Sequence, residues 1–366
     1  MKKHAIIPIF IPHLGCENDC VFCNQKIITA KSDPVSPNDA EQTILEYLST
    51  LRVYDDIKKC DNPPTVEIAF YGGSFTGLDI ETQNKYLDLA LKYKRLGKID
   101  KIHMSTRPDY INSAILDNLK AHQVDIIELG VQSFDEAVLK ASKRGHKISD
   151  IYYACNLIKT YGFSLGIQLM IGLPNDSKEK SIESARLAAQ IQPDIARLYP
   201  TLVLPDTELF EMMKLGKYSP LSQKDAIEIC KEMYKILTEK NINIIRVGLK
   251  SSDLINFDNP LLSNYHPAFR QLVEGEIARE SIDCQLDLLN SVDITAYTLS
   301  ANPKSFSNLI GHKAKNRYYF EKKLSNIKLN FRSDSSIPIG KYKINADILI
   351  ILVFLHAADT TFKSYI

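Results

Sequence analysis

The sequence lacks a surplus of charge of either sign, long apolar runs and low-complexity segments. Its 366 residues carry 45 Lys and Arg against 44 Asp and Glu, with only 15 Gly and 16 Pro. These balances exclude a disordered chain, a collagen, a coiled coil and a wholly basic protein. The apolar run 348–355 is far shorter than the ~20 residues that a bilayer requires, and the proline-containing run 5–12 has no cleavage site after it. We therefore expect no membrane contact and a cytoplasmic protein.

A disulfide framework is also absent, because the seven cysteines are odd in number and unevenly spaced. Cys16, Cys20 and Cys23 form a C-x3-C-x2-C cluster, which in a reducing compartment indicates metal binding or redox chemistry. The other four are dispersed, and we interpret them mostly as small buried hydrophobic residues. They are Cys60, Cys155, Cys230 and Cys284.

Apolar runs rich in β-branched residues alternate with segments of helical spacing, which predicts an α/β fold. The expected strands are 5–11, 65–71, 101–106, 125–131, 164–171, 194–199 and 242–248. The expected helices lie near 37–52, 80–95, 111–121, 135–142, 148–161, 177–190 and 222–240. This alternation implies parallel strands, either in an open doubly wound sheet or in a (β/α) barrel. It breaks down near residue 250, so we predict a core of residues 1–250 and a separate C-terminal region, 251–366.

Unusual residues collect where the predicted strands end. The cysteine cluster follows the first strand, Gly72 and Gly73 end the second, Gln132 ends the fourth and Gly172 ends the fifth. Both candidate folds place ligands at the carboxyl ends of the strands. These residues therefore predict one active site at that edge of the sheet.

Three thiolates this close together can converge on one metal centre. An isolated zinc site usually takes four ligands, and no second pair with suitable spacing follows. A four-iron cluster held by three cysteines keeps one iron open to an exogenous ligand. A structural zinc knuckle and chance clustering are the alternatives.

The cluster, with the aromatic Phe22 directly before Cys23, resembles the signature of the radical S-adenosylmethionine (SAM) superfamily. The resemblance covers roughly residues 5–250. It implies a partial (β/α)6 TIM-like barrel with a smaller α+β extension, and a [4Fe-4S] cluster on Cys16, Cys20 and Cys23. It also implies that SAM binds the open iron. One electron, from a reductant such as flavodoxin or ferredoxin, would then yield methionine and a 5′-deoxyadenosyl radical that abstracts hydrogen from an unidentified substrate.

The same resemblance suggests a SAM pocket. Gly72, Gly73 and Ser74 match the glycine-rich element whose backbone holds the methionine amine, with Ser74 where an acid is often found. In relatives similar to oxygen-independent coproporphyrinogen oxidase, residues matching Gln132 and Arg144 contact the ribose and the carboxylate of SAM. Ser105 and Gln168 match positions that are acidic there. The alternatives are a plain turn, core-facing polar residues and a surface arginine.

More specific motifs resemble the radical-SAM subunit of Elongator, which modifies the wobble uridine of tRNA with acetyl-CoA. They include 106–110, 128–133, 144–146, 198–203, 207–209 and 216–218. Here the first two cysteines are closer together than in that branch, and no glycine-rich acyl-CoA loop of an acetyltransferase follows. The resulting hypothesis is a radical SAM enzyme acting on a tRNA base. Porphyrinogen or other small-molecule chemistry, a haem-binding chaperone without turnover, and an RNA-binding protein with a structural cluster are the alternatives.

The C-terminal region contains a basic and aromatic segment, Lys313–Arg332, in which cations interleave with Tyr318, Tyr319, Phe320 and Phe331. Cations for phosphate and aromatic rings for stacking are what RNA binding uses, so this segment is a candidate tRNA contact. A helix whose aromatic residues face the core is the alternative. We interpret His266, beside Pro267, as a structural residue.

Overall fold

The computed structural model of the chain describes residues 4–11, 15, 16, 19–24, 27, 35–50, 65–249, 264–288 and 294–348. They form two compact units, residues 1–270 and residues 271–366, which are described separately below. The predicted boundary near residue 250 lies outside the described residues, as do Cys60 and, apart from Ile348, the apolar run 348–355. None of the helices in the described ranges is long and apolar enough to cross a membrane.

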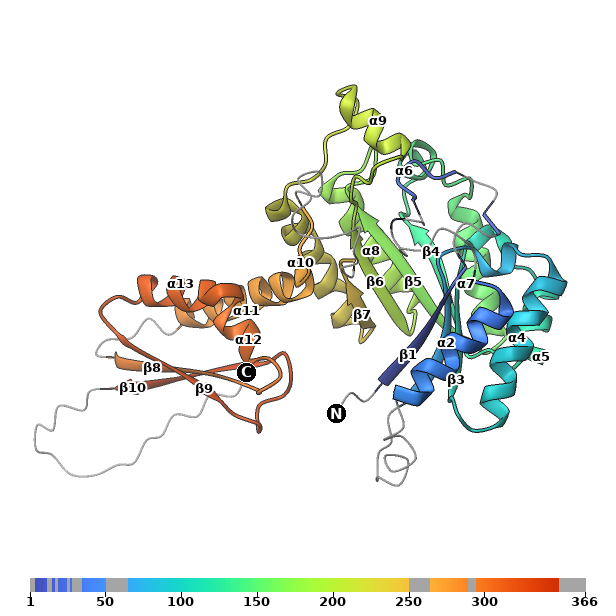
Figure 1. Cartoon of the computed structure of the whole chain (residues 1–366). Helices are drawn as coiled ribbons and strands as arrows, with labels where there is room; N and C mark the ends of the chain where they lie inside the picture. The colour runs from blue at the N-terminus through green and yellow to red at the C-terminus, as the bar shows by residue number, and fades with distance from the viewer. Residues whose placement is uncertain are drawn as a thin grey trace, which may run out of the picture. The chain divides into compact units, whose positions relative to one another are not determined.

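The first unit is built on a curled sheet of seven parallel strands (Figure 1). They are β1 (His4–Phe10), β2 (Thr65–Tyr71), β3 (Lys101–Thr106), β4 (Ile126–Gln132), β5 (Ser164–Ile171), β6 (Ile195–Pro200) and β7 (Asn243–Val247). Each strand pairs with its neighbour in sequence, so the order never reverses as it would in a doubly wound sheet. The fold is therefore the predicted partial barrel, with β7 as an additional edge strand.

Helices on the outside of the sheet connect these strands (Figure 1). They are α2 (Pro37–Thr50), α4 (Ile80–Arg95), α5 (Ser113–Ala121), α6 (Glu136–Ala141), α7 (Ile148–Thr160), α8 (Lys178–Ile191), α9 (Glu208–Lys214) and α10 (Gln223–Glu239), with the short 3-10 helices η1 (Phe75–Gly77) and η2 (Pro108–Tyr110). Several begin at a side chain that accepts a hydrogen bond from the first turn, as Asp79 does for α4 and Asn112 for α5. The helices cover the outer face of the sheet, and every residue of β4, the middle strand, is buried.

Three aspartates join the amino ends of neighbouring strands. The carboxylate of Asp100 accepts from Val66 N at 2.8 Å, that of Asp125 from Ile102 N at 2.7 Å, and that of Asp194 from Leu165 N at 2.8 Å. Each aspartate directly precedes the strand next to the one it holds. A one-residue slip would break these bonds and turn each strand's side chains to the other face, so the aspartates help to fix the register.

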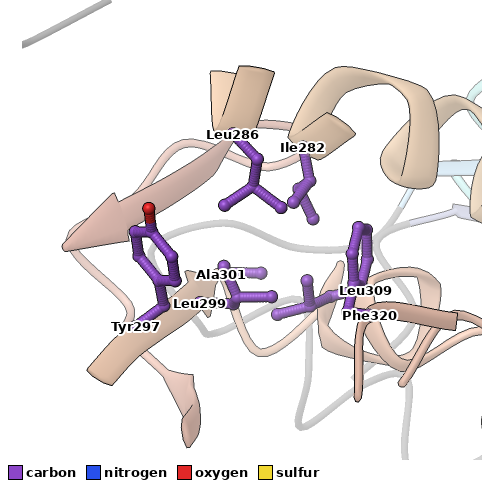
Figure 2. Packing of buried hydrophobic residues seen from close by; sticks show 7 residues of the cluster. All are labelled: Ile282, Leu286, Tyr297, Leu299, Ala301, Leu309 and Phe320. Carbon is purple, nitrogen blue, oxygen red and sulfur yellow. The ribbon is translucent and has the colours of Figure 1, made fainter. Parts of the chain in front are cut away.

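The second unit is an α+β module with a three-stranded sheet in the order β10–β8–β9. Its elements are α11 (Phe269–Leu288), which begins in the first unit, β8 (Ile294–Ala301), α12 (Phe306–Ile310), η3 (His312–Ala314), α13 (Lys315–Lys323), β9 (Lys328–Ser333) and β10 (Tyr342–Ile348). Its core joins Ile282 and Leu286 of α11 to Leu299 of β8, Leu309 and Phe320 (Figure 2). This module is the predicted smaller extension.

Candidate active site

Two glycines bring the cysteine loop against the end of β2. A Cβ atom on Gly15 would lie 2.2 Å from the Ser74 carbonyl oxygen, and one on Gly77 would lie 2.1 Å from the Gly15 carbonyl oxygen. Gly15 also has a φ of +71°, which disfavours other residues. This close approach places the Cys16 Sγ atom 3.2 Å from Ser74 Oγ. The first cysteine therefore lies beside Ser74, which directly follows Gly72 and Gly73 after the carboxyl end of β2.

The second part of the loop is attached to residues that follow α6 and β6. Val21 N donates to the Ser142 carbonyl at 3.2 Å, and Leu209 N donates to the Val21 carbonyl at 2.8 Å. Val21 also packs in a small core with Val203 and Leu209, against which Phe22 lies partly buried. These contacts fix the backbone between Cys20 and Cys23.

Arg144 lies against the second cysteine. Its Nη1 atom donates to Cys20 Sγ at 3.2 Å and its Nη2 atom to the Gly130 carbonyl at 2.6 Å, whereas its buried Nε atom has no partner in the described chain. Sequence reasoning expected this guanidinium at the carboxylate of SAM. The structure places it beside a candidate cluster ligand.

Gln132 occupies a strained position at the end of β4. Its φ is +69°, the pairing of β4 with β5 shifts register there, and its buried Oε1 atom has no hydrogen-bond partner among the described residues. Such backbone strain and unpaired polar atoms collect at ligand sites. Gln132 and Arg144 therefore leave polar groups that a polar cofactor can satisfy.

Ser105 and Gln168 both contact one carboxylate that the sequence analysis did not single out. Ser105 Oγ donates to Glu128 Oε1 at 3.0 Å, and Gln168 Nε2 donates to the same oxygen. Glu128 lies on β4, between the strands of its two partners, and its side chain crosses Gly166, where a Cβ atom would lie 2.9 Å from it. Positions 105 and 168 lack the acidic side chains that the family resemblance led us to expect, and the Glu128 carboxylate supplies a negative charge between them.

Glu128 belongs to a buried charged network across the strands. Arg197 Nε lies 2.7 Å from Glu128 Oε2, and Arg197 Nη2 donates to the hydroxyl of Tyr71 at 2.7 Å. Although burial opposes the charge, Glu128 and the adjacent tyrosines raise the pKa of Arg197 well above its ordinary value. A charged residue inside an apolar strand run, as in 126–129 and 195–198, is the sequence signal that could have revealed this pair.

A second carboxylate on the same network is held by two histidines. Glu67 lies 3.2 Å from His103 Nδ1 and 3.0 Å from His4 Nε2. Burial alone would raise the pKa of Glu67, but hydrogen bonds from His103 and His4 lower it to about 2. The interior of the half-barrel is therefore charged and polar rather than a purely apolar core.

A cavity of about 570 Å³ opens outside the cysteine loop. Its lining includes Asp19 from the loop, the lysines Lys140, Lys143 and Lys147, and His146. Burial, together with the charges of Arg144 and Arg107, lowers the pKa of His146 to about 3, so this imidazole is neutral at physiological pH. The positively charged side chains that line this cavity are therefore its three lysines.

The three thiols do not converge in this structure. Across the described residues, which include all three, no three side chains of Cys, His, Asp or Glu lie close enough to hold one metal ion. Two of the thiols are engaged elsewhere, by Ser74 and by Arg144. Thiols are nevertheless the donors that iron–sulfur clusters use, and binding a metal commonly orders its own site. The residue types therefore fit a cluster that brings the thiols together.

The half-barrel is an α/β fold of the kind that places ligands at the carboxyl ends of its strands, and its cysteine loop lies at that rim. Residues 10–188 match the family model of the radical SAM superfamily, and residues 193–279 match the Radical_SAM C-terminal domain. The chain belongs to the radical SAM superfamily and is an enzyme of that type. The cofactors of this superfamily are a [4Fe-4S] cluster and SAM, and its enzymes need a reductant.

Several curated proteins are similar to this chain. A tRNA uridine(34) acetyltransferase from Methanocaldococcus infernus is 28% identical over 62% of this chain and 48% of that protein. Human Elongator complex protein 3 is 32% identical over 60% of this chain and 46% of that protein. The heme chaperone HemW of Bacillus subtilis is 25% identical over 69% of this chain and 63% of that protein. The chain spans about half the length of the first of these relatives.

The fold is also similar to a solved structure. The archaeal Methanocaldococcus infernus Elp3, with its N-terminus deleted, superposes with a TM-score of 0.53 at 24% identity, covering 69% of this chain and 61% of that one. At this identity the similarity concerns the fold alone. It agrees with the parallel half-barrel derived from the strand order.

Proposed function

We propose that Cys16, Cys20 and Cys23 hold the [4Fe-4S] cluster of this enzyme. The proposal depends mainly on one observation, that Cys16 and Cys20 already lie at 3.2 Å from Ser74 and Arg144, the residues expected beside the cofactor. The bonds from Val21 to Ser142 and Leu209 keep the loop at this rim. If the cluster binds, Cys16 and Cys20 would lose their thiol protons, and iron would replace the Ser74 and Arg144 contacts of their sulfur atoms.

SAM would bind beside the cluster. Gly72, Gly73 and Ser74 would hold its amine, Arg144 its carboxylate, Gln132 its ribose and Phe22 a flank of the site. Ser105 and Gln168 would act through Glu128, whose carboxylate can accept from ribose hydroxyls. The cofactors together supply a 5′-deoxyadenosyl radical, formed with one electron from a reductant such as flavodoxin or ferredoxin. The protein's own part is to bind, to orient and to exclude water.

We infer that the substrate is a tRNA base of the wobble-uridine class. The curated relative named for tRNA uridine(34) supports this class, as do the Elongator-like motifs at 106–110, 128–133 and 144–146. The proposal concerns the class of base and not the product of the reaction, because the chain spans about half the length of these relatives.

The cofactor proposal is tested by SAM cleavage. After anaerobic reconstitution with iron and sulfide, addition of SAM and dithionite should yield 5′-deoxyadenosine. Cys16→Ala, Cys20→Ala and Cys23→Ala should each abolish it, while Cys284→Ala, which removes an exposed thiol of α11, should not. Four irons per chain with no 5′-deoxyadenosine would contradict the proposal. Nucleoside mass spectrometry of tRNA treated with the enzyme would then identify the modified base.

A haem-carrying role is a second candidate. It is favoured by the similarity to the heme chaperone HemW, whose alignment covers 69% of this chain. It predicts tight haem binding by the purified protein without consumption of SAM. Titration with haem, followed in the Soret band, separates the two functions. Cleavage of SAM without haem binding would exclude the chaperone role.

A further inference from the structure

The three-stranded sheet of the second unit has two unlike faces. On one face Tyr297, Leu299 and Ala301 of β8 pack with Phe331 of β9 and Ile344 of β10. Figure 2 shows the β8 side chains directed at Ile282, Leu286, Leu309 and Phe320, which lie on the helices. Alternate residues of a strand point to opposite faces, so the residues between these apolar positions form the other face.

That second face is polar and basic. One row sets Ser300 between Arg332 of β9 and Lys343 of β10, and the next row sets Thr298 between Asn330 and Asn345. Arg332 and Asn345 are exposed, Lys343, Asn330 and Thr298 are half-buried, and Ser300 is buried. Since neighbouring strands lie ~4.8 Å apart, Arg332 and Lys343 are separated by two strand spacings, about 10 Å.

Within the part of the chain that the structure describes, no ion pair neutralises the cations of this face. Among the described residues Lys328, Arg332 and Lys343 have no carboxylate within salt-bridge distance, although Lys328 begins a row whose far position is Asp347. Asp334 follows β9. Hydrogen bonds from Ser336 lower the pKa of its carboxyl, and the charges of Arg332 and Lys343 add to the effect. The influence of both cations on one carboxyl agrees with their lying on the same side of the sheet.

The helix side of the unit differs, although it carries much of the predicted basic and aromatic segment. Arg317 is paired with Glu321 at 2.7 Å, and Lys323 is paired with Asp283 at 2.9 Å. Tyr319 donates to the same Asp283 at 2.7 Å. Phe320 is fully buried. These pairings engage Arg317, Lys323 and Tyr319 within the unit and make them less available to RNA. Lys313, Lys322 and Tyr318 of the same segment are exposed.

We propose that the polar face of β8, β9 and β10, defined by Thr298, Asn330, Arg332, Lys343 and Asn345, binds the sugar–phosphate backbone of RNA. This inference rests on the proposed tRNA substrate and names the surface that holds it. Lysine, arginine, serine, threonine and asparagine are the side chains that contact phosphate and sugar. The strand positions on this face include no aromatic residue, so the contact tolerates any sequence and base choice is left to the active site.

The test measures RNA affinity without SAM, so that its outcome is independent of radical chemistry. The probe is an unmodified tRNA transcript with uridine at position 34, titrated with full-length, cluster-loaded protein. The double substitution Arg332→Gln and Lys343→Gln should weaken binding about tenfold near physiological salt, and should reduce the slope of log K against log salt by about 1.5 for two lost phosphate contacts. The charge-retaining pair Arg332→Lys and Lys343→Arg should bind nearly as well as the wild type.

The matched control replaces two cations of α13, Lys315→Gln and Arg317→Gln, and should leave tRNA affinity unchanged. The proposal is overturned if the Arg332 and Lys343 double variant binds tRNA as tightly as the wild type, or if the α13 variant loses as much affinity as that double variant. Failure of the wild-type protein to bind the transcript would also overturn it. A slower flavodoxin-driven reaction with unchanged tRNA affinity would assign the face to an acidic protein instead. If tRNA binds through this face but no 5′-deoxyadenosine forms, the proposed function fails while the RNA surface stands.

Discussion

At the scale of single residues, the buried ion pair of Glu128 and Arg197 is the feature of the half-barrel that depends most on its partners for stability. Both side chains are buried, and Glu128 also receives Ser105 and Gln168. A buried charge that loses its partner is far more costly than a pair replaced together. The network therefore stabilises the protein only as a complete set.

We predict that Glu128→Gln lowers the free energy of unfolding by about 3–5 kcal/mol, because it leaves the Arg197 guanidinium buried without a counter-charge. The combined change Glu128→Gln and Arg197→Met should recover much of the loss. Urea denaturation of cluster-free protein measures both values. Glu183→Gln, which breaks an exposed pair with Arg186, is the control and should cost less than about 1 kcal/mol. A double variant less stable than the single one would contradict this account.

At the scale of elements, the approach of the cysteine loop to η1 depends on Gly15 and Gly77. The contact is made backbone against backbone, with no room for a side chain on either residue. The loop that carries Cys16 is therefore positioned by two residues that have no chemistry of their own.

Gly15→Ala should displace Cys16 from Ser74 and reduce iron loading after reconstitution, since its Cβ atom would overlap the Ser74 carbonyl. Gly97→Ala is the control: Gly97 also has a positive φ, +63°, but no atom lies within 4 Å of its would-be Cβ. That substitution should cost about 1 kcal/mol in stability and leave iron content unchanged. The measurement is iron per chain together with cluster absorbance. Equal iron content in the two variants would show that the close approach is dispensable.

The strands were predictable from sequence because buried parallel strands are short apolar runs bounded by turn residues. The ranges 65–71, 101–106 and 164–171 agree with β2, β3 and β5. The helix expected near 111–121 begins instead at Ser113, because the Asn112 side chain accepts a hydrogen bond from Ile115 N at 3.0 Å and caps the helix there. Local patterns thus locate an element better than they locate its ends.

Motif spacing predicted which residues belong to the site, but it could not predict which of their side chains contact one another. The meeting of Ser105, Glu128 and Gln168 depends on the register of three strands. The splitting of the segment Lys313–Arg332 between two sides of a sheet depends on the alternation within β9. Such relations need the three-dimensional arrangement, because residues distant in sequence determine them.

At the scale of the whole molecule, the chain divides into two compact units, and the described residues of each include buried apolar side chains that pack within that unit. The C-terminal core is small and is centred on Leu299, which is fully buried. A protein with separate cores need not unfold in one step.

We predict that Leu299→Ala destabilises the C-terminal unit by about 2–5 kcal/mol and lowers one calorimetric transition without moving the other. Cleavage of SAM in the absence of RNA should be unaffected. Ile339→Ala, at an exposed position of the same unit, should shift neither transition. A single transition that moves as a whole in the Leu299 variant would show that the two units unfold together.

The aspartates that precede β3, β4 and β6 have a consequence for how such a protein can diverge. They secure the strands at the rim away from the chemistry, through contacts that do not involve the loops after the strands. Loops at the opposite rim can then gain, lose or exchange residues while the scaffold stays aligned. A chain of this kind can acquire a new substrate by mutation in its connecting segments alone, and transplanting those segments between relatives should preserve folding more often than transplanting strands.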